Sequence, residues 1–278
     1  MKLNIVPAST GVQWVRSGIQ TFWRYPMALS ALFFLCMVTM SLVSMVPMIG
    51  PVLALALLPM SSLVMMVGAT ESLRGRIPSP SLVLVGVRSG QMRLQYMLQL
   101  GAFYAVSFLA VIGLSCLIDG GSFAQVYLGF APMTLEMATA PGFQTAMWFT
   151  LLVYIPLSLV FWHAPGLVHW HGIAPFKAMF FSWVACARNW RAFGMFFLAW
   201  MGVFMLTGLV LTLLVGLLTA LVGPLASGLM VGAAMLLAAI FFTTVVITFR
   251  DCFSAPDGRD TLEPYGDQAA SSTHHHGS

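Results

Sequence analysis

The residues best suited to chemistry are three histidines close together in the sequence, His163, His169 and His171. Imidazole nitrogens bind Zn and Fe, and this spacing would suit such a metal if a carboxylate or thiolate completed the shell. Between residues 153 and 181, however, the sequence contains no Asp, Glu or Cys. We therefore predict no metal site and interpret the three histidines as amphipathic side chains at a membrane interface, beside Trp162 and Trp170. A metal site remains the alternative.

Other catalytic patterns are missing from the sequence. A Ser-His-Asp set, an HExxH pair, a glycine-rich phosphate loop and paired carboxylates on one side of a membrane are all absent. We therefore predict a protein that is not an enzyme, with no catalytic residue and no cofactor. The alternative is a membrane-embedded lipid-modifying enzyme that grips a phosphate with Arg188, Arg191 and His169.

The composition identifies the elements that must position these residues. The chain is 59% hydrophobic and 7% charged, whereas soluble domains carry roughly a quarter charged residues. About 20 apolar residues cross a bilayer as a helix, and six stretches meet that length. They are residues 27–46, 52–70, 97–117, 145–162, 193–217 and 225–249. The sequence predicts an all-α transmembrane fold, a six-helix bundle of three hairpins, with a membrane domain over residues 1–253.

The basic residues predict the orientation. All twelve Lys and Arg lie in four stretches, 2–24, 74–93, 177–191 and 250–259, separated by pairs of apolar spans. Because short basic loops stay in the cytoplasm, both termini are expected there. The 119–144 loop then lies outside, with Asp119 and Glu136 as the only external charges.

A cytoplasmic amphipathic helix is expected before each hairpin, within residues 12–24, 80–93 and 176–191. In the first, Val12, Val15, Ile19, Phe22 and Trp23 form the apolar arc, which Trp14 interrupts. Trp23-Arg24 and Trp190-Arg191 end the first and third segments alike, and Arg93 has a similar place in the second, which indicates three copies of one unit. The predicted contacts with anionic lipid headgroups come from Arg24, Arg93, Lys177, Arg188 and Arg191. Nucleic acid is not an expected partner.

Local features give further expectations. Pro59 and Pro156 should bend their spans, with nearby Ser hydroxyls bonding the freed carbonyls or, alternatively, supplying oxygens for a transport site. Glu71 is expected to pair with Arg74, and the Gly228/Gly232 step to pack within the chain, with dimerisation as the alternative. Gly223-Pro224 should form the last outer turn, and residues 254–278 a disordered tail that ends in a native or added His triplet.

Several motifs resemble an uncharacterised family of proteobacterial six-span integral membrane proteins. They are SMVPMIGPVLA at 44–54, LPMSSL at 58–63, APGLVHWHG at 164–172, PFKAMFFS at 175–182 and ARNWRAF at 187–193. The resemblance covers residues 10–250 and implies a bacterial inner membrane. It implies no activity and carries no catalytic residue.

The expected function is therefore non-enzymatic: small-solute transport, or a scaffold role in a membrane assembly. The expected partners are anionic membrane lipids and a membrane protein.

Overall fold

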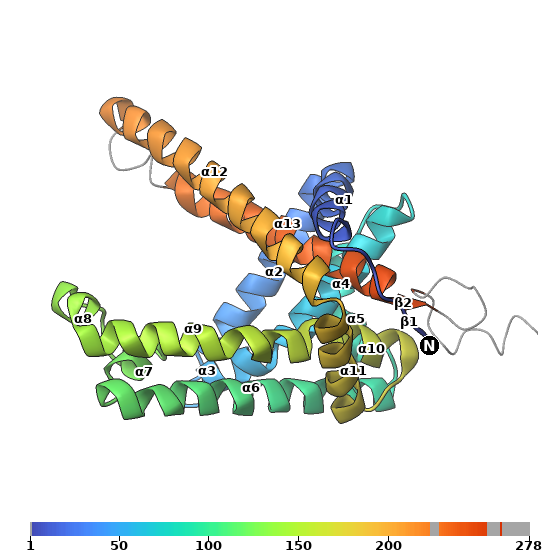
Figure 1. Ribbon diagram of the computed structural model, residues 1–278, viewed down its shortest axis with the longest axis horizontal. Helices are drawn as coiled ribbons and strands as arrows, with labels where there is room; N and C mark the ends of the chain where they lie inside the picture. The colour runs from blue at the N-terminus through green and yellow to red at the C-terminus, as the bar shows by residue number, and fades with distance from the viewer. Residues whose placement is uncertain (1, 223–227, 255–261, 263–278) are drawn as a thin grey trace, which may run out of the picture.

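The computed structural model describes residues 2–222, 228–254 and 262, and these are almost entirely helical (Figure 1). The elements are β1 (Lys2–Leu3), α1 (Thr10–Arg24), α2 (Pro26–Ser44), α3 (Gly50–Ala56), α4 (Leu58–Leu73), η1 (Pro80–Leu84), α5 (Val85–Arg88), α6 (Gln91–Asp119), α7 (Ser122–Tyr127), α8 (Leu135–Thr139), α9 (Pro141–Trp162), α10 (Ala164–His171), α11 (Pro175–Arg188), α12 (Trp190–Val222), α13 (Gly228–Cys252) and β2 (Phe253–Ser254).

Six helical segments are long and apolar enough to cross a membrane: α2, α3 with α4, α6, α9 with α10, α12 and α13. The predicted all-α six-span fold is confirmed. The predicted stretches fall inside these segments, except that residues 45–46 lie beyond the end of α2 and residues 225–227 lie outside the described residues. Gly223-Pro224 and nearly all of the predicted tail also lie outside them.

The second span is broken beside Pro59, as its ring and missing N–H require. α3 ends at Ala56 and α4 begins at Leu58. Ser61 does not bond a freed carbonyl, because its hydroxyl donates to Met40 Sδ at 3.4 Å. Pro156, by contrast, lies inside the continuous helix α9.

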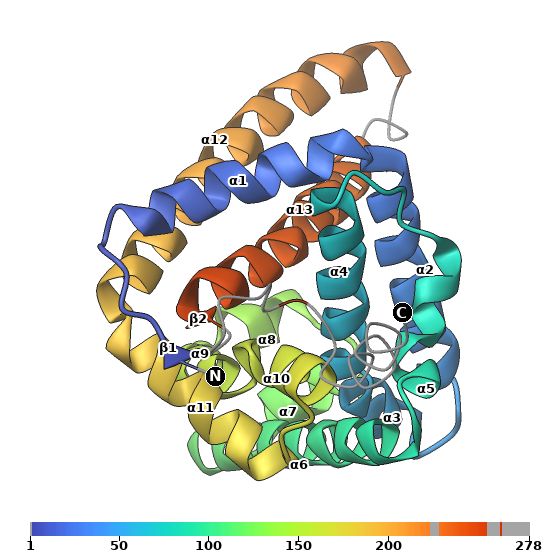
Figure 2. The ribbon, with the colours of Figure 1, turned by 90° about the vertical axis from the view of Figure 1, so that its right-hand side faces the viewer.

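The three hairpins form a ring around α10 when viewed from the side where β1 and β2 lie (Figure 2). The segment before each hairpin packs mainly against the neighbouring hairpin of this ring rather than against its own, and for α1 this neighbour is the third hairpin. α1 contacts α12 and α13, η1 and α5 contact the first hairpin, and α11 contacts α6 and α9. The three units are therefore interlocked rather than side by side.

Small residues on α1 allow this packing. Gly11 faces the backbone of α12 at Ala192 and Phe196, and Gly18 faces Thr244 of α13, with no room for a Cβ at either glycine. Trp14 lies between them, is 1% exposed and donates from Nε1 to Asp251 Oδ2 at 2.9 Å. The interpretation of Trp14 as an interruption is wrong, because the buried face follows the glycines and leaves Val12 and Trp23 exposed.

α11 repeats this use of small residues. Ala178, Ser182 and Ala185 are fully buried, whereas the bulky residues Phe176 and Phe180 are exposed. Ala178 and Ala185 precede Trp190 at the spacing with which Gly11 and Gly18 precede Trp23. Both helices therefore pack on the protein through small side chains at equivalent positions.

The middle segment is not one helix. η1 and α5 are short, and the chain turns at Ser89 and Gly90 before α6 begins at Gln91. Gly90 has a φ of 93°, a conformation that few other residues adopt. Arg93 therefore lies in the first turn of a membrane-spanning helix.

The two ends of the membrane domain are joined. β1 pairs antiparallel with β2, and the Asn4 N–H donates to the Cys252 carbonyl at 2.9 Å. Asn189 is 2% exposed; its Oδ1 accepts from Val6 N at 2.8 Å and its Nδ2 donates to the Asn4 carbonyl at 3.0 Å. Residues 2–6 and 252–254 thus lie on the same side of the bundle, as an even number of crossings requires.

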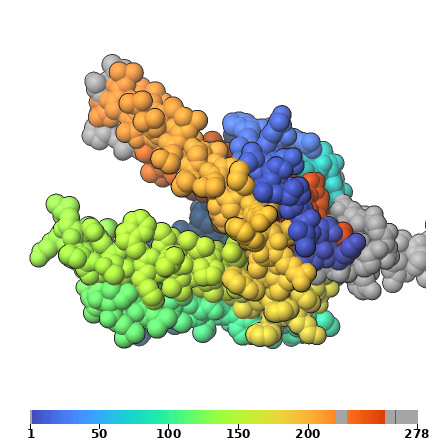
Figure 3. Space-filling model, in the orientation of Figure 1, coloured from blue at the N-terminus to red at the C-terminus, as the bar shows by residue number. Residues whose placement is uncertain are grey.

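The second hairpin (α6, α9) and the third (α12, α13) diverge away from that side (Figures 1 and 3). At their base the Trp162 ring lies 5.7 Å from that of Phe197 and 5.6 Å from that of Phe241. We call the space between the two hairpins the inter-hairpin cleft. The expected packing of Gly228 and Gly232 within the chain is wrong for the described residues, because no atom lies within 4 Å of the point that a Cβ would occupy at either.

Candidate functional site

The five basic residues predicted to contact lipid headgroups lie on four helices and do not form one cluster. Arg24 ends α1, Arg93 begins α6, Lys177 and Arg188 lie at opposite ends of α11, and Arg191 begins α12. All except Arg93 are exposed. Arg24 donates to the Leu73 carbonyl at 3.2 Å, and the Arg191 guanidinium lies 5.5 Å from the Trp190 ring centroid. Arg93 is half-buried, which distinguishes it from the others.

Two other arginines, which were not predicted to contact lipid, have carboxylate partners. Arg76 pairs with Glu71 at 2.6 Å, and Arg250 pairs with Asp251 at 3.3 Å. The expected Glu71–Arg74 pair is therefore wrong: the Arg74 guanidinium instead donates to the Leu262 carbonyl at 3.3 Å. The chain turns back after Arg74, with Arg76 N bonded to the Glu71 carbonyl, and this turn brings Arg76 to the carboxylate.

His163 is fully buried where α9 meets α10. Its Nε2 lies 3.1 Å from Thr248 Oγ1, and its backbone N donates to Ser182 Oγ at 2.9 Å. Its Nδ1 lies 3.8 Å from Cys186 Sγ. Burial and the neighbouring Cys252 raise the pKa of the Cys186 thiol well above its usual value. A protonated thiol is a poor metal ligand and nucleophile, so this arrangement joins α9, α11 and α13 without offering reactive chemistry.

His169 and His171 make different contacts. His169 Nδ1 lies 3.0 Å from Ser89 Oγ, which donates to the Val85 carbonyl at 2.6 Å. His171 instead lies near Phe249, with the ring centroids 6.1 Å apart. Within the described part of the chain, no three His, Cys, Asp or Glu side chains form a group that could hold a metal ion.

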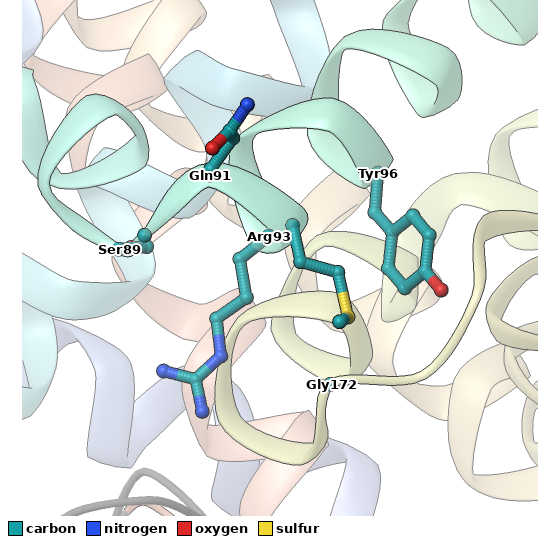
Figure 4. A pocket seen from close by; sticks show the side chains of 7 residues that line it. Ser89, Gln91, Arg93, Tyr96 and Gly172 are labelled. Carbon is teal, nitrogen blue, oxygen red and sulfur yellow. The ribbon is translucent and has the colours of Figure 1, made fainter.

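A pocket of about 290 Å³ lies where the start of α6 meets the end of α10 (Figure 4). It is lined by Ser89, Gly90, Gln91, Met92, Arg93, Tyr96 and Gly172. Arg93 and Tyr96 both extend from α6 on the side of Gly172, but their polar ends point apart, and Gln91 points away from Gly172 (Figure 4). No carboxylate lines this pocket.

Sequence reasoning found Arg93 and His169 but did not connect them. Their proximity follows from the packing of α10 against α6, and Ser89 completes the link through its contact with His169. Ser89, Tyr96 and Gly172 were missed as site residues. Gly172 carried a signal, since a glycine just after a helical stretch often ends the helix, and here it does so with a φ of 63°.

These features define a multi-pass α-helical membrane protein with a basic pocket at one end of its bundle. The chain is 35% identical over 260 residues to a probable inner membrane protein of Burkholderia thailandensis, an alignment that covers 92% of this chain and 96% of the relative. The chain therefore belongs to this family of proteobacterial inner membrane proteins, as the resemblance predicted. No family model matches the sequence, and no solved structure matches it.

Proposed function

We propose that the protein is a non-enzymatic scaffold of the inner membrane that receives a membrane-spanning helix of a partner protein in the inter-hairpin cleft. The observation that carries this proposal is the divergence of the second and third hairpins from a common base (Figure 3). In the most apolar 18-residue stretch of α12, no residue is buried within the chain. A helix of the partner protein in the cleft would cover apolar surface on both hairpins.

Glycines on the third hairpin favour a helix as the occupant. Gly202, Gly208 and Gly216 of α12 have no atom within 4 Å of the point that a Cβ would occupy, and Gly228 and Gly232 of α13 are equally open. Small residues let helix backbones approach closely in lipid, where packing rather than the hydrophobic effect drives association. On the other side of the protein, Arg24, Lys177, Arg188 and Arg191 would hold the scaffold on the anionic cytoplasmic leaflet.

The arrangement of His169 disfavours the alternative, a lipid-modifying enzyme. The Ser89 hydroxyl donates its hydrogen bond to the Val85 carbonyl, so in its contact with His169 it is the acceptor and the imidazole is the donor. An imidazole that donates to a serine does not act as its general base. Loss of the gene should therefore leave the lipid mass spectrum without an accumulated substrate.

Photocrosslinking in native membranes tests the scaffold. A photoreactive amino acid replaces Leu152 of α9 or Leu213 of α12, both 68% exposed, and Leu42 of α2, which is 62% exposed, as the matched control. We expect the same discrete protein adduct from positions 152 and 213 and none from 42. Adducts with lipid alone, or equal protein adducts at all three positions, would overturn the proposal.

A further inference from the structure

The pocket between α6 and Gly172 has the chemistry of a specific anion site. We propose that it binds the headgroup of an anionic phospholipid, with the Arg93 guanidinium as the donor to the phosphate and the Tyr96 hydroxyl as a donor to a separate oxygen of the headgroup. A guanidinium makes paired hydrogen bonds to phosphate oxygens, and a phenol can donate to another oxygen of the headgroup. This proposal extends the headgroup contact that the sequence predicts for Arg93 and is independent of the inter-hairpin cleft.

The charge of Arg93 is available to a ligand. None of the four carboxylates in the described ranges pairs with it: Glu71 and Asp251 bond arginines, Asp119 accepts from the backbone of Gly121 and Phe123, and Glu136 lies on α8 at the far end of the second hairpin. A half-buried guanidinium without a counter-ion favours an anion more strongly than a fully solvated one does.

Contacts within the chain hold the backbone on both sides of the pocket. The 3.0 Å contact of Ser89 Oγ with His169 Nδ1 holds the turn before α6 against α10. Gly90 and Gly172 make the two backbone turns, with φ values of 93° and 63°. A site formed by two packed helices loses little conformational entropy when it binds, so modest contacts suffice for a specific site.

Size and position favour a lipid. A volume of about 290 Å³ is at the lower limit of small-molecule pockets, enough for a headgroup but not for a whole lipid. Met92 is 63% exposed at the pocket, and Phe103, about three helical turns further along the same face of α6, is 43% exposed. These apolar side chains continue from the pocket along the membrane-spanning helix, the direction in which acyl chains would extend.

Lipid retention by the purified full-length protein tests the site. The protein is equilibrated in nanodiscs with equal amounts of phosphatidylglycerol and phosphatidylcholine, extracted, and examined by native mass spectrometry for bound lipid. Arg93→Gln should lower retained phosphatidylglycerol roughly tenfold, the effect of losing a charge-assisted hydrogen bond. Tyr96→Phe should lower it about threefold. Arg88→Gln, at an exposed arginine of α5 that does not line the pocket, is the matched control and should change it by less than about twofold.

Two further measurements make the result decisive. Arg93→Lys keeps the charge but not the paired geometry, so it should retain more lipid than Arg93→Gln and less than the parent, which separates binding from misfolding. Equal losses in Arg88→Gln and Arg93→Gln, or no loss in Arg93→Gln, would overturn the site.

The second measurement distinguishes a lipid from free phosphate. Inorganic phosphate is titrated in nanodiscs of phosphatidylcholine alone. Arg93-dependent phosphate binding there, without Arg93-dependent lipid retention, would overturn the lipid as the source of the phosphate. Neither result depends on the crosslinks at positions 152 and 213.

Discussion

Gly11 and Gly18 occupy positions where a methyl group would change how two helices cross. A Cβ on Gly18 would overlap the Thr244 side chain, and one on Gly11 would meet the Ala192 carbonyl. Gly194 of α12, in contrast, has open space around it. The same chemical change therefore has opposite expected effects at these sites.

We predict that Gly18→Ala destabilises the protein by about 1–3 kcal/mol, because it forces α1 away from α13. Gly194→Ala should stabilise it by up to about 1 kcal/mol, because alanine loses less backbone entropy in a helix. Thermal unfolding in one detergent measures both. Shifts of the same sign would show that the α1–α13 crossing is looser than described.

At the scale of elements, Asn189 joins three parts of the chain. Besides Val6 and Asn4 of the N-terminal segment, its side chain bonds the Ala185 carbonyl within α11 at 3.0 Å and Cys252 Sγ at the end of α13 at 3.7 Å. Because Asn189 is buried, truncating it leaves donors and acceptors of the N-terminal segment without partners.

We predict that Asn189→Ala costs about 1–3 kcal/mol and releases residues 2–6 from β2. Hydrogen exchange should become faster in that segment, while exchange in α6 and α9 stays unchanged. Gln20→Ala, at an exposed position of α1, is the control. Unchanged exchange in residues 2–6 would mean that strand pairing alone holds the N-terminus.

The elements themselves were largely predictable. Bilayer thickness sets the length of an apolar helix, so local composition was enough to find all six spans, and Pro59 indicated the break in the second. Long-range packing was not predictable, since Gly11 and Ala192 are far apart in the sequence. The bulky arc of α11 pointed to a lipid-facing surface, whereas small residues that carry almost no hydropathy signal form its protein-facing side. The pocket was missed for the same reason, because Ser89 meets His169 only through the packing of α10.

At the scale of the whole molecule, the pairing of the two ends shows that the number of membrane crossings is even. It does not show which side of the membrane the ends occupy. β1 and β2 lie together, so both ends of the membrane domain share one side. The distribution of basic residues predicts that this side is cytoplasmic.

We predict that a fluorescent protein fused after Ser278 fluoresces, as it does when it folds in the cytoplasm. Glu136→Cys should react with an impermeant maleimide added to intact spheroplasts, whereas Arg16→Cys should react only after lysis. The parent protein, with its four native cysteines, provides the background. Reaction of Arg16→Cys in intact spheroplasts would show that the orientation is the opposite of the predicted one.

The interlocked ring has a consequence for biosynthesis. α1 is made before α12 and α13, yet Trp14 packs on Phe193 and Phe196 of α12 and bonds Asp251 of α13, the last spans to be inserted. Until then the nascent chain carries an aromatic face with no docking place, a natural recognition signal for a chaperone or a quality-control protease. A stop codon after the second hairpin should therefore give a product that is rapidly degraded, even though four of its spans are intact.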